Sequence, residues 1–105
     1  MNDKTLVVAE TAIDALSYAA LFGLERKRFV STAGQLNPEQ PELLKRAAVK
    51  MMDPYAEIIL ALDNDEAGHA MAERLMPSLN EVLPCRPHFP TAAGTDWNDE
   101  LRQDA

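Results

Sequence analysis

Cysteine is almost absent from this 105-residue sequence, and long apolar runs are absent altogether. The single cysteine, Cys85, rules out an internal disulfide bond. No apolar run approaches the roughly 18 residues that a membrane-spanning helix needs, and the first residues, Met-Asn-Asp-Lys, lack a signal-peptide pattern. We therefore expect a cytoplasmic protein without a membrane segment, in which Cys85 packs inside the fold.

Basic side chains are also scarce. Lys and Arg together number 10 against 17 Asp and Glu, which gives a net charge of −7. Because nucleic-acid affinity depends largely on Lys and Arg at phosphates, this domain alone is not expected to hold a nucleic-acid backbone. If the substrate is DNA or RNA, other domains or chains must make most of the contacts that bind it. The one basic cluster, Arg26-Lys27-Arg28, is expected to be a solvated turn, with backbone contact as the alternative.

Length and a 47% apolar content suit one domain with a single core. Short apolar runs predict strands, and they alternate with segments of helical periodicity. The expected strands are Thr5–Ala9, Arg28–Thr32, Ile58–Leu62 and Cys85–Phe89. Strands that alternate with helices pair in parallel through right-handed crossovers. The sequence thus predicts a compact Rossmann-like α/β fold over residues 1–105, with about four mainly parallel strands flanked by helices.

Three amphipathic helices and a short terminal one are expected around these strands. They run from a Thr11 cap to Gly23, from Pro41 to Asp53-Pro54, from Glu66 to an interruption or end near Pro77, and over Asp96–Leu101. The apolar positions are Ile13, Leu16, Ala20 and Leu21 in the first helix, Leu43, Leu44, Ala47, Ala48 and Met51 in the second, and Ala67, Ala70, Met71, Leu75, Leu79 and Val82 in the third.

Acidic residues follow the ends of two expected strands. The central apolar run stops at Asp63-Asn64-Asp65, and the first strand stops at Glu10. Because parallel strands end at the same edge of a sheet, these three carboxylates can converge there. Carboxylate oxygens without a nearby His or Cys select Mg²⁺ or Mn²⁺. This edge is therefore a candidate metal site.

Each acid also has a simpler role in folding. Asp63 can end the strand, Asp65 can cap the next helix, and Glu10 can interact with a helix dipole. Asp14 lies one helical turn beyond Glu10, where it can orient Glu10 or a water, or be plainly solvated. The site interpretation is favoured because one Asp would suffice to end the strand and start the helix.

A Mg²⁺ site of this kind retains several waters and takes further ligands from substrate phosphates. The chemistry that follows is phosphoryl or nucleotidyl transfer, or phosphodiester cleavage. Two other acidic folds fit poorly. A receiver domain would need an acidic pair after its first strand and a late lysine, whereas no lysine follows Lys50. An Asp-x-Asp phosphatase would carry its pair on the first strand.

Four segments, in order, resemble the Toprim family, which bacterial-type primases, type IA and II topoisomerases and certain nucleases and recombination proteins share. Leu6–Ser17 is similar to a strand ending in Glu with an Asp four residues later, and Leu62–Gly68 to a strand ending in Asp-x-Asp. Val30–Gly34 resembles the second strand with its glycine turn. Asp96–Leu101 resembles the tail motif of Toprim domains in plasmid primases and mobilisation (relaxase-type) proteins.

The resemblance implies roles for the acids. Asp63 and Asp65 would bind Mg²⁺ or Mn²⁺, and Glu10 would be a further ligand or a general acid/base. Asp14 would join Glu10 in the catalytic group. Supporting roles fall to Glu66, Asp96 and Asp99, for which helix-end roles are the alternative.

Two residues depart from the family pattern. Thr11 stands where the family usually has Gly, and Thr95 stands where relatives often carry Lys. The leading hypothesis is a Mg²⁺-dependent, primase-like nucleotidyltransferase domain of plasmid or mobile-element type, part of a larger protein, with DNA and nucleoside triphosphates as partners. It rests on the arrangement of Glu10, Asp63 and Asp65 together with the tail motif, and the similarity of Asp-Asn-Asp-Glu-Ala-Gly to the primase form favours a primase over a topoisomerase. One alternative is metal-dependent DNA nicking at the same site. The other is a non-catalytic module for DNA handling or assembly, which Thr11, Thr95 and the acidic charge balance favour.

The remaining aromatic residues and histidines are assigned to packing. Tyr18 and Tyr55 lie in or beside expected helices, so we interpret them as packing or surface residues rather than as a topoisomerase nucleophile. His69 and His88 lack metal-ligand spacing from each other. Trp97 is expected to cover the core or a neighbouring domain, with base stacking as the alternative.

Overall fold

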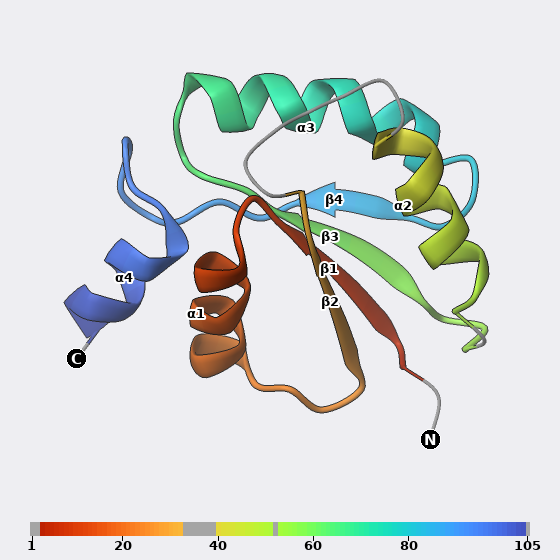
Figure 1. The fold of residues 1–105 in the computed structure, drawn as a ribbon, viewed down its shortest axis with the longest axis horizontal. Helices are drawn as coiled ribbons and strands as arrows, with labels where there is room; N and C mark the ends of the chain where they lie inside the picture. Colours follow the sequence, from red (N-terminus) through yellow and green to blue (C-terminus); the bar gives the residue numbers. More distant parts are fainter. Residues whose placement is uncertain (1–2, 33–39, 52, 105) are drawn as a thin grey trace.

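The computed structural model describes residues 3–32, 40–51 and 53–104 (Figure 1). Strands and helices alternate along the chain, as expected. Their bounds are β1 Thr5–Ala9, α1 Ala12–Phe22, β2 Lys27–Ser31, α2 Gln40–Val49, β3 Glu57–Ala61, α3 Glu66–Leu79, β4 Cys85–Pro87 and α4 Trp97–Asp104. The expected glycine turn at Ala33-Gly34 and residues 37–39 of the loop before α2 lie outside the described residues.

The four strands form one sheet in the order β2-β1-β3-β4, and every neighbouring pair is parallel. At the carboxyl end of the central strands, Ala9 of β1 pairs with Ser31 of β2 on one side and Ala61 of β3 on the other. The ends of β1 and β3 are therefore level with each other. The predicted α/β fold with a four-stranded parallel sheet is confirmed.

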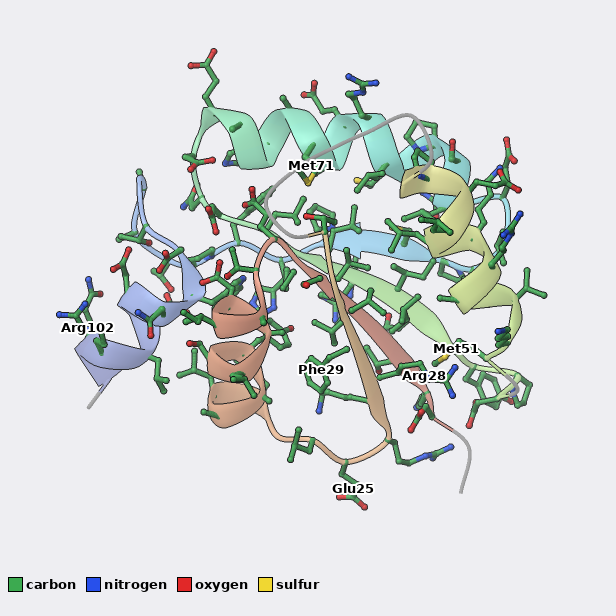
Figure 2. All side chains as sticks on the ribbon, in the orientation of Figure 1. Glu25, Arg28, Phe29, Met51, Met71 and Arg102 are labelled. Atoms are coloured by element: carbon green, nitrogen blue, oxygen red, sulfur yellow. The ribbon has the colours of Figure 1, made fainter. Side chains whose placement is uncertain are left out.

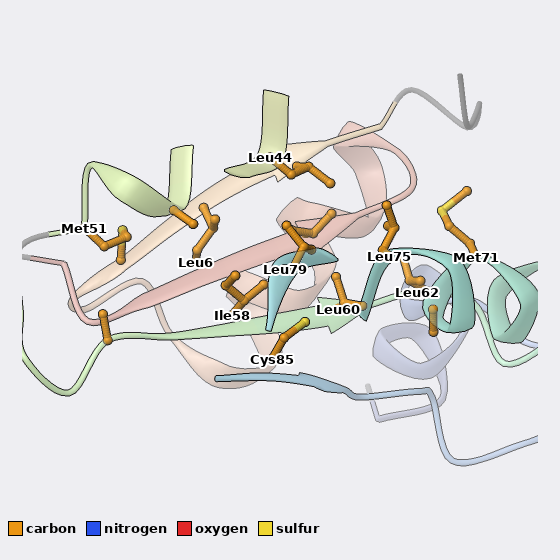
Figure 3. Packing of buried hydrophobic residues seen from close by; sticks show 14 residues of the cluster. Leu6, Leu44, Met51, Ile58, Leu60, Leu62, Met71, Leu75, Leu79 and Cys85 are labelled. Atoms are coloured by element: carbon orange, nitrogen blue, oxygen red, sulfur yellow. The ribbon is translucent and has the colours of Figure 1, made fainter. Parts of the chain in front are cut away.

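The central strands β1 and β3 are buried on both faces, which explains their apolar runs, whereas the outer strands β2 and β4 contain exposed basic residues. Helices α2 and α3 cover one face, and α1 and α4 cover the other (Figure 1). The larger core, under α2 and α3, consists of Leu6, Val8, Leu44, Ala48, Met51, Ala56, Ile58, Leu60, Leu62, Met71, Ala72, Leu75, Leu79 and Cys85 (Figure 3). The smaller core, under α1 and α4, consists of Val7, Tyr18, Ile59, Ala61 and Trp97. The expected burial of Cys85 and Trp97 is confirmed.

Helix α3 presents only part of the face that its periodicity predicts, because Ala67 and Ala70, expected on the apolar side, are exposed. Met71, Leu75 and Leu79 are buried, and Figure 2 shows Met71 on the side of the helix that faces the sheet. The helix does not end at Pro77 but continues to Leu79. A proline is tolerated there because it stands in the last turn and removes only one hydrogen bond of the helix.

Helix α1 does not present the predicted face. Ile13 and Leu16, expected in the core, are 62% and 71% exposed, whereas Asp14, Ser17 and Tyr18 are buried. The buried side of α1 faces the sheet and α4, which brings polar groups of its own. The periodicity prediction for this helix was therefore wrong, because a neighbour from the far end of the chain selects the buried face.

Smaller differences concern element ends. Strand β4 stops at Pro87 instead of reaching Phe89, although the His88 N–H still donates to the Leu60 carbonyl at 2.9 Å. In α2, Leu43 is 52% exposed, while Leu44 is buried as expected. None of the described helices has the length and apolar character needed to cross a membrane.

Candidate metal centre

Glu10 and Asp63 meet at the carboxyl-end edge of the sheet. Glu10 directly follows β1, and Asp63 lies two residues after β3. The Asp63 backbone N–H donates to Glu10 Oε2 at 2.8 Å. Two residues 53 positions apart are thus held together because their strands are adjacent, parallel and in register.

Asp63 is in an unfavourable environment for a carboxylate. Burial raises its pKa to about 8, and the neighbouring Glu10 acts in the same direction through its charge and a hydrogen bond. The charges of Asp14 and Asp65 add to this effect. Among the described residues, Asp63 Oδ1 is buried without a hydrogen-bond partner. A cation beside this oxygen would stabilise the charged form.

Asp65 performs the simpler role considered for it. It is the N-cap of α3, and its Oδ1 accepts a hydrogen bond from the Gly68 N–H at 2.7 Å. Gly68 is required here, because a Cβ atom at this position would lie 2.1 Å from the Asp63 carbonyl oxygen. The Asp-x-Asp-x-Ala-Gly pattern therefore lets α3 start directly against the Asp63 backbone. Glu66 follows on the exposed first turn of α3.

Asp14 joins the edge from α1. Thr11 caps this helix as expected, accepting a hydrogen bond from the Asp14 N–H at 3.1 Å. The Asp14 side chain is 3% exposed, and its Oδ1 accepts from the Asn98 N–H at 3.4 Å. Burial raises the pKa of Asp14, and the charges of Asp96 and Glu10 act in the same direction. Asp14 thus lies between Glu10 and the start of α4.

Asp96 and Asp99, near the end of the chain, mainly cap the N-terminus of α4. The Asp99 N–H donates to Asp96 Oδ1 at 2.8 Å, and the Asp96 N–H donates to Asp99 Oδ2 at 3.1 Å. This reciprocal pair is the geometry of a capping box. Asp96 also brings its charge close enough to Asp14 to influence it. We refer to Glu10, Asp14, Asp63, Asp65 and Asp96 together as the acidic edge; Figure 2 shows oxygen-tipped side chains where α1, α3 and α4 begin.

The donors of the acidic edge fit Mg²⁺ or Mn²⁺. Within the part of the chain that the structure describes, no three Asp, Glu, His or Cys side chains already form a metal cage. Mg²⁺ does not require one, because it is commonly held by one or two carboxylates, waters and substrate phosphates. Asp63 Oδ1 and the Glu10 carboxylate offer such oxygens. Zinc would favour His or Cys, which this edge lacks.

The two histidines contact other side chains of the fold, as expected for structural residues. His88 Nδ1 lies 2.7 Å from the Tyr18 hydroxyl, and burial lowers the pKa of His88. Tyr18 also packs edge-on against Trp97, with ring centroids 4.9 Å apart. His69 pairs with Asn64 at 2.9 Å. These contacts confirm the packing assignment for Tyr18, whereas Tyr55 is a surface residue, 78% exposed.

Comparison with known proteins agrees with this geometry. A family model described as Toprim-like matches residues 7–101. The chain belongs to the Toprim-like family. It is 32% identical over 112 residues to an uncharacterized protein of Bacillus anthracis, pXO2-78, a match covering 95% of this chain and 32% of that protein. The chain therefore spans about a third of the relative's length.

Membership of the Toprim-like family implies metal-dependent handling of nucleic acid. In this Toprim-like domain, Thr11 replaces the usual glycine and uses its hydroxyl to cap α1. The sequence interpretation missed two residues that shape the site, Asn64 and Gly68. The Ala-Gly after the acidic pair was a usable signal for Gly68, whereas the contacts of Asn64 depend on a loop about 30 residues away in sequence.

Proposed function

We propose that this domain provides the metal-binding half of a primase-like nucleotidyltransferase of plasmid or mobile-element type. The observation that carries the proposal is the contact between Glu10 and Asp63, beside a buried Asp63 oxygen that finds no hydrogen-bond partner among the described residues. Asp63 and Asp65 hold Mg²⁺ or Mn²⁺ in this proposal. A bound metal would neutralise charge on substrate phosphate oxygens.

Glu10 and Asp14 act next to the metal ligands. In this proposal Glu10 is a further ligand or accepts the proton of an attacking 3′-hydroxyl, and the hydrogen bond from the Asp63 N–H to its carboxylate supports that role. Asp14 orients Glu10 or a water from α1. It also accepts a hydrogen bond from the Asn98 N–H at the start of α4. Asp96 and Asp99 contribute chiefly by fixing α4, and Glu66 by its charge at the exposed first turn of α3.

The domain is further proposed to be part of a longer polypeptide. The match to a relative of about three times the length supports this. A net charge of −7 supports it too, since other domains would then hold the nucleic acid.

A non-catalytic Toprim module is the second candidate. Asp65 and Asp96 both use carboxylate oxygens to cap helices, and no three-ligand cage is preformed within the described ranges. Such a module would keep the fold for assembly or DNA handling without loading a metal.

Metal titration separates the two candidates. We expect Mg²⁺ and Mn²⁺ to bind the chain at millimolar concentration, measured by calorimetry and thermal unfolding. Metal at ten times its Kd would stabilise the fold by about 1.4 kcal/mol. The Asp63→Asn, Asp65→Asn double variant should lose this response, whereas Glu73→Gln, an exposed acid elsewhere on α3, should keep it.

An unchanged response in the double variant, or none in the unmodified chain, would contradict the proposal and favour the non-catalytic module. Activity assays then distinguish the reactions. Primer synthesis requires nucleoside triphosphates and a template, whereas metal-dependent nicking of plasmid DNA requires neither.

A further inference from the structure

Asn64, the residue between the two aspartates, uses all four of its polar groups. Its N–H donates to the Thr95 carbonyl at 2.9 Å, and its own carbonyl accepts from the Gly94 N–H at 2.6 Å. Its side-chain Nδ2 donates to the Pro90 carbonyl at 2.8 Å, and its Oδ1 lies 2.9 Å from His69 Nε2. Three of the four bonds reach the loop that leads into α4, and the fourth reaches α3.

These contacts fix the orientation of the amide. The Pro90 carbonyl can only accept, so the NH₂ group of Asn64 must face it. Asn64 Oδ1 therefore faces His69, and His69 Nε2 must carry the hydrogen. An Asp at this position would turn a carboxylate toward the Pro90 carbonyl, and an Ala would lose both side-chain bonds. Among short side chains, Asn alone carries its donor and its acceptor on two separate atoms, Nδ2 and Oδ1, which here reach two different partners.

The same loop is held at neighbouring points. Phe89 stacks on His69 with ring centroids 4.0 Å apart, and His88 pairs with Tyr18 of α1. Asp96 follows this loop immediately, and Asn98 then donates its N–H to Asp14. The loop that Asn64 holds is therefore the connection between the two halves of the acidic edge.

We infer that Asn64 is a positioning residue for the metal centre. It sets the distance between the Asp63–Asp65 turn and the Asp14–Asp96 side of the acidic edge, with His69 fixing its amide from α3. This inference rests on the proposed function, because it assumes that the edge binds a divalent metal. Residues that orient metal ligands typically change metal affinity by 10–100-fold when they are replaced.

Calorimetric Mg²⁺ titration of variants tests the inference. Asn64→Ala should weaken Mg²⁺ binding about tenfold. His69→Gln, which keeps a donor near the Nε2 position, should stay within about twofold of the unmodified chain, whereas His69→Leu should weaken binding. His69 is exposed, so its variants remain folded even if Asn64→Ala does not. Ile58→Val, in the larger core, controls for a general loss of stability.

The outcomes separate the two proposals. If the unmodified chain binds no Mg²⁺, the proposed function fails and the inference fails with it. If the unmodified chain binds Mg²⁺ but Asn64→Ala and His69→Leu bind it equally well, only the inference is overturned, and Asn64 merely fastens a loop. The same affinity loss in Ile58→Val would also overturn it, since the effect would then follow stability.

Discussion

Three consecutive residues, Asp63, Asn64 and Asp65, have three different tasks. Asp63 supplies an oxygen without a hydrogen-bond partner among the described residues, Asn64 holds the loop before α4, and Asp65 starts α3. Burying a carboxylate oxygen next to Glu10 costs free energy, and ending a strand or starting a helix does not require it. The ionised form of Asp63 is therefore destabilised in the folded protein, and a bound cation would offset this destabilisation.

This cost predicts how stability depends on pH in the absence of metal. The folded-state pKa of Asp63, about 8, lies above its ordinary value of 3.8. Between these values the folded protein retains a proton that the unfolded chain releases, so the free energy of unfolding should fall as pH rises from about 4 to about 8. Asp63→Asn should make this decline shallower. Urea denaturation at a series of pH values measures the effect.

The raised pKa of Asp14 also makes the free energy of unfolding fall as pH rises. The difference between the unmodified chain and Asp63→Asn therefore isolates the contribution of Asp63. Glu73→Gln serves as the control and should leave the decline unchanged. Equal declines in the unmodified chain and Asp63→Asn would show that Asp63 is ionised at neutral pH like an ordinary carboxylate.

At the scale of elements, local patterns predicted the strands and most of the helix ends. β1 and β3 each contain four consecutive apolar residues, and Thr11 and Asp65 are caps that their residue types indicate. The meeting of Glu10 and Asp63 followed from the parallel topology alone. What the sequence could not show depends on contacts between distant segments: α1 turns Asp14 rather than Leu16 inward because α4, more than 80 residues later, packs on that side.

A pair of substitutions checks this assignment of helix faces. Leu16→Gln on α1 should change the free energy of unfolding by less than about 0.5 kcal/mol, because Leu16 is 71% exposed and the two residues have similar helix propensity. Leu75→Ala on α3 should cost about 2–5 kcal/mol, because Leu75 is fully buried. Urea denaturation measures both. Comparable losses at the two positions would mean that α1 buries the face its periodicity predicts.

At the scale of the whole molecule, basic and acidic side chains lie in different regions. The basic cluster was expected to be a solvated turn, but Lys27 and Arg28 lie in β2, and only Arg26 lies in the turn, with a positive φ of 56°. Arg26 is paired with Asp53 and Arg28 with Asp3. The cations are thus partly neutralised, while the acidic edge gathers carboxylates at the opposite end of the strands.

This distribution predicts weak, metal-dependent binding of nucleic acid by the isolated chain. Fluorescence anisotropy with a labelled DNA duplex, in the absence of metal, should give a Kd at or above about 100 µM, the weak end of non-specific binding at physiological salt. Mg²⁺ should strengthen binding by neutralising the acidic edge and bridging to phosphates. The Asp63→Asn, Asp65→Asn variant should bind slightly better without metal, because Asp65→Asn removes a negative charge, but should gain nothing from Mg²⁺. Micromolar binding without metal, with a steep salt dependence, would instead mean that Lys27 and its neighbours form a phosphate-binding surface, and that the domain holds nucleic acid unaided.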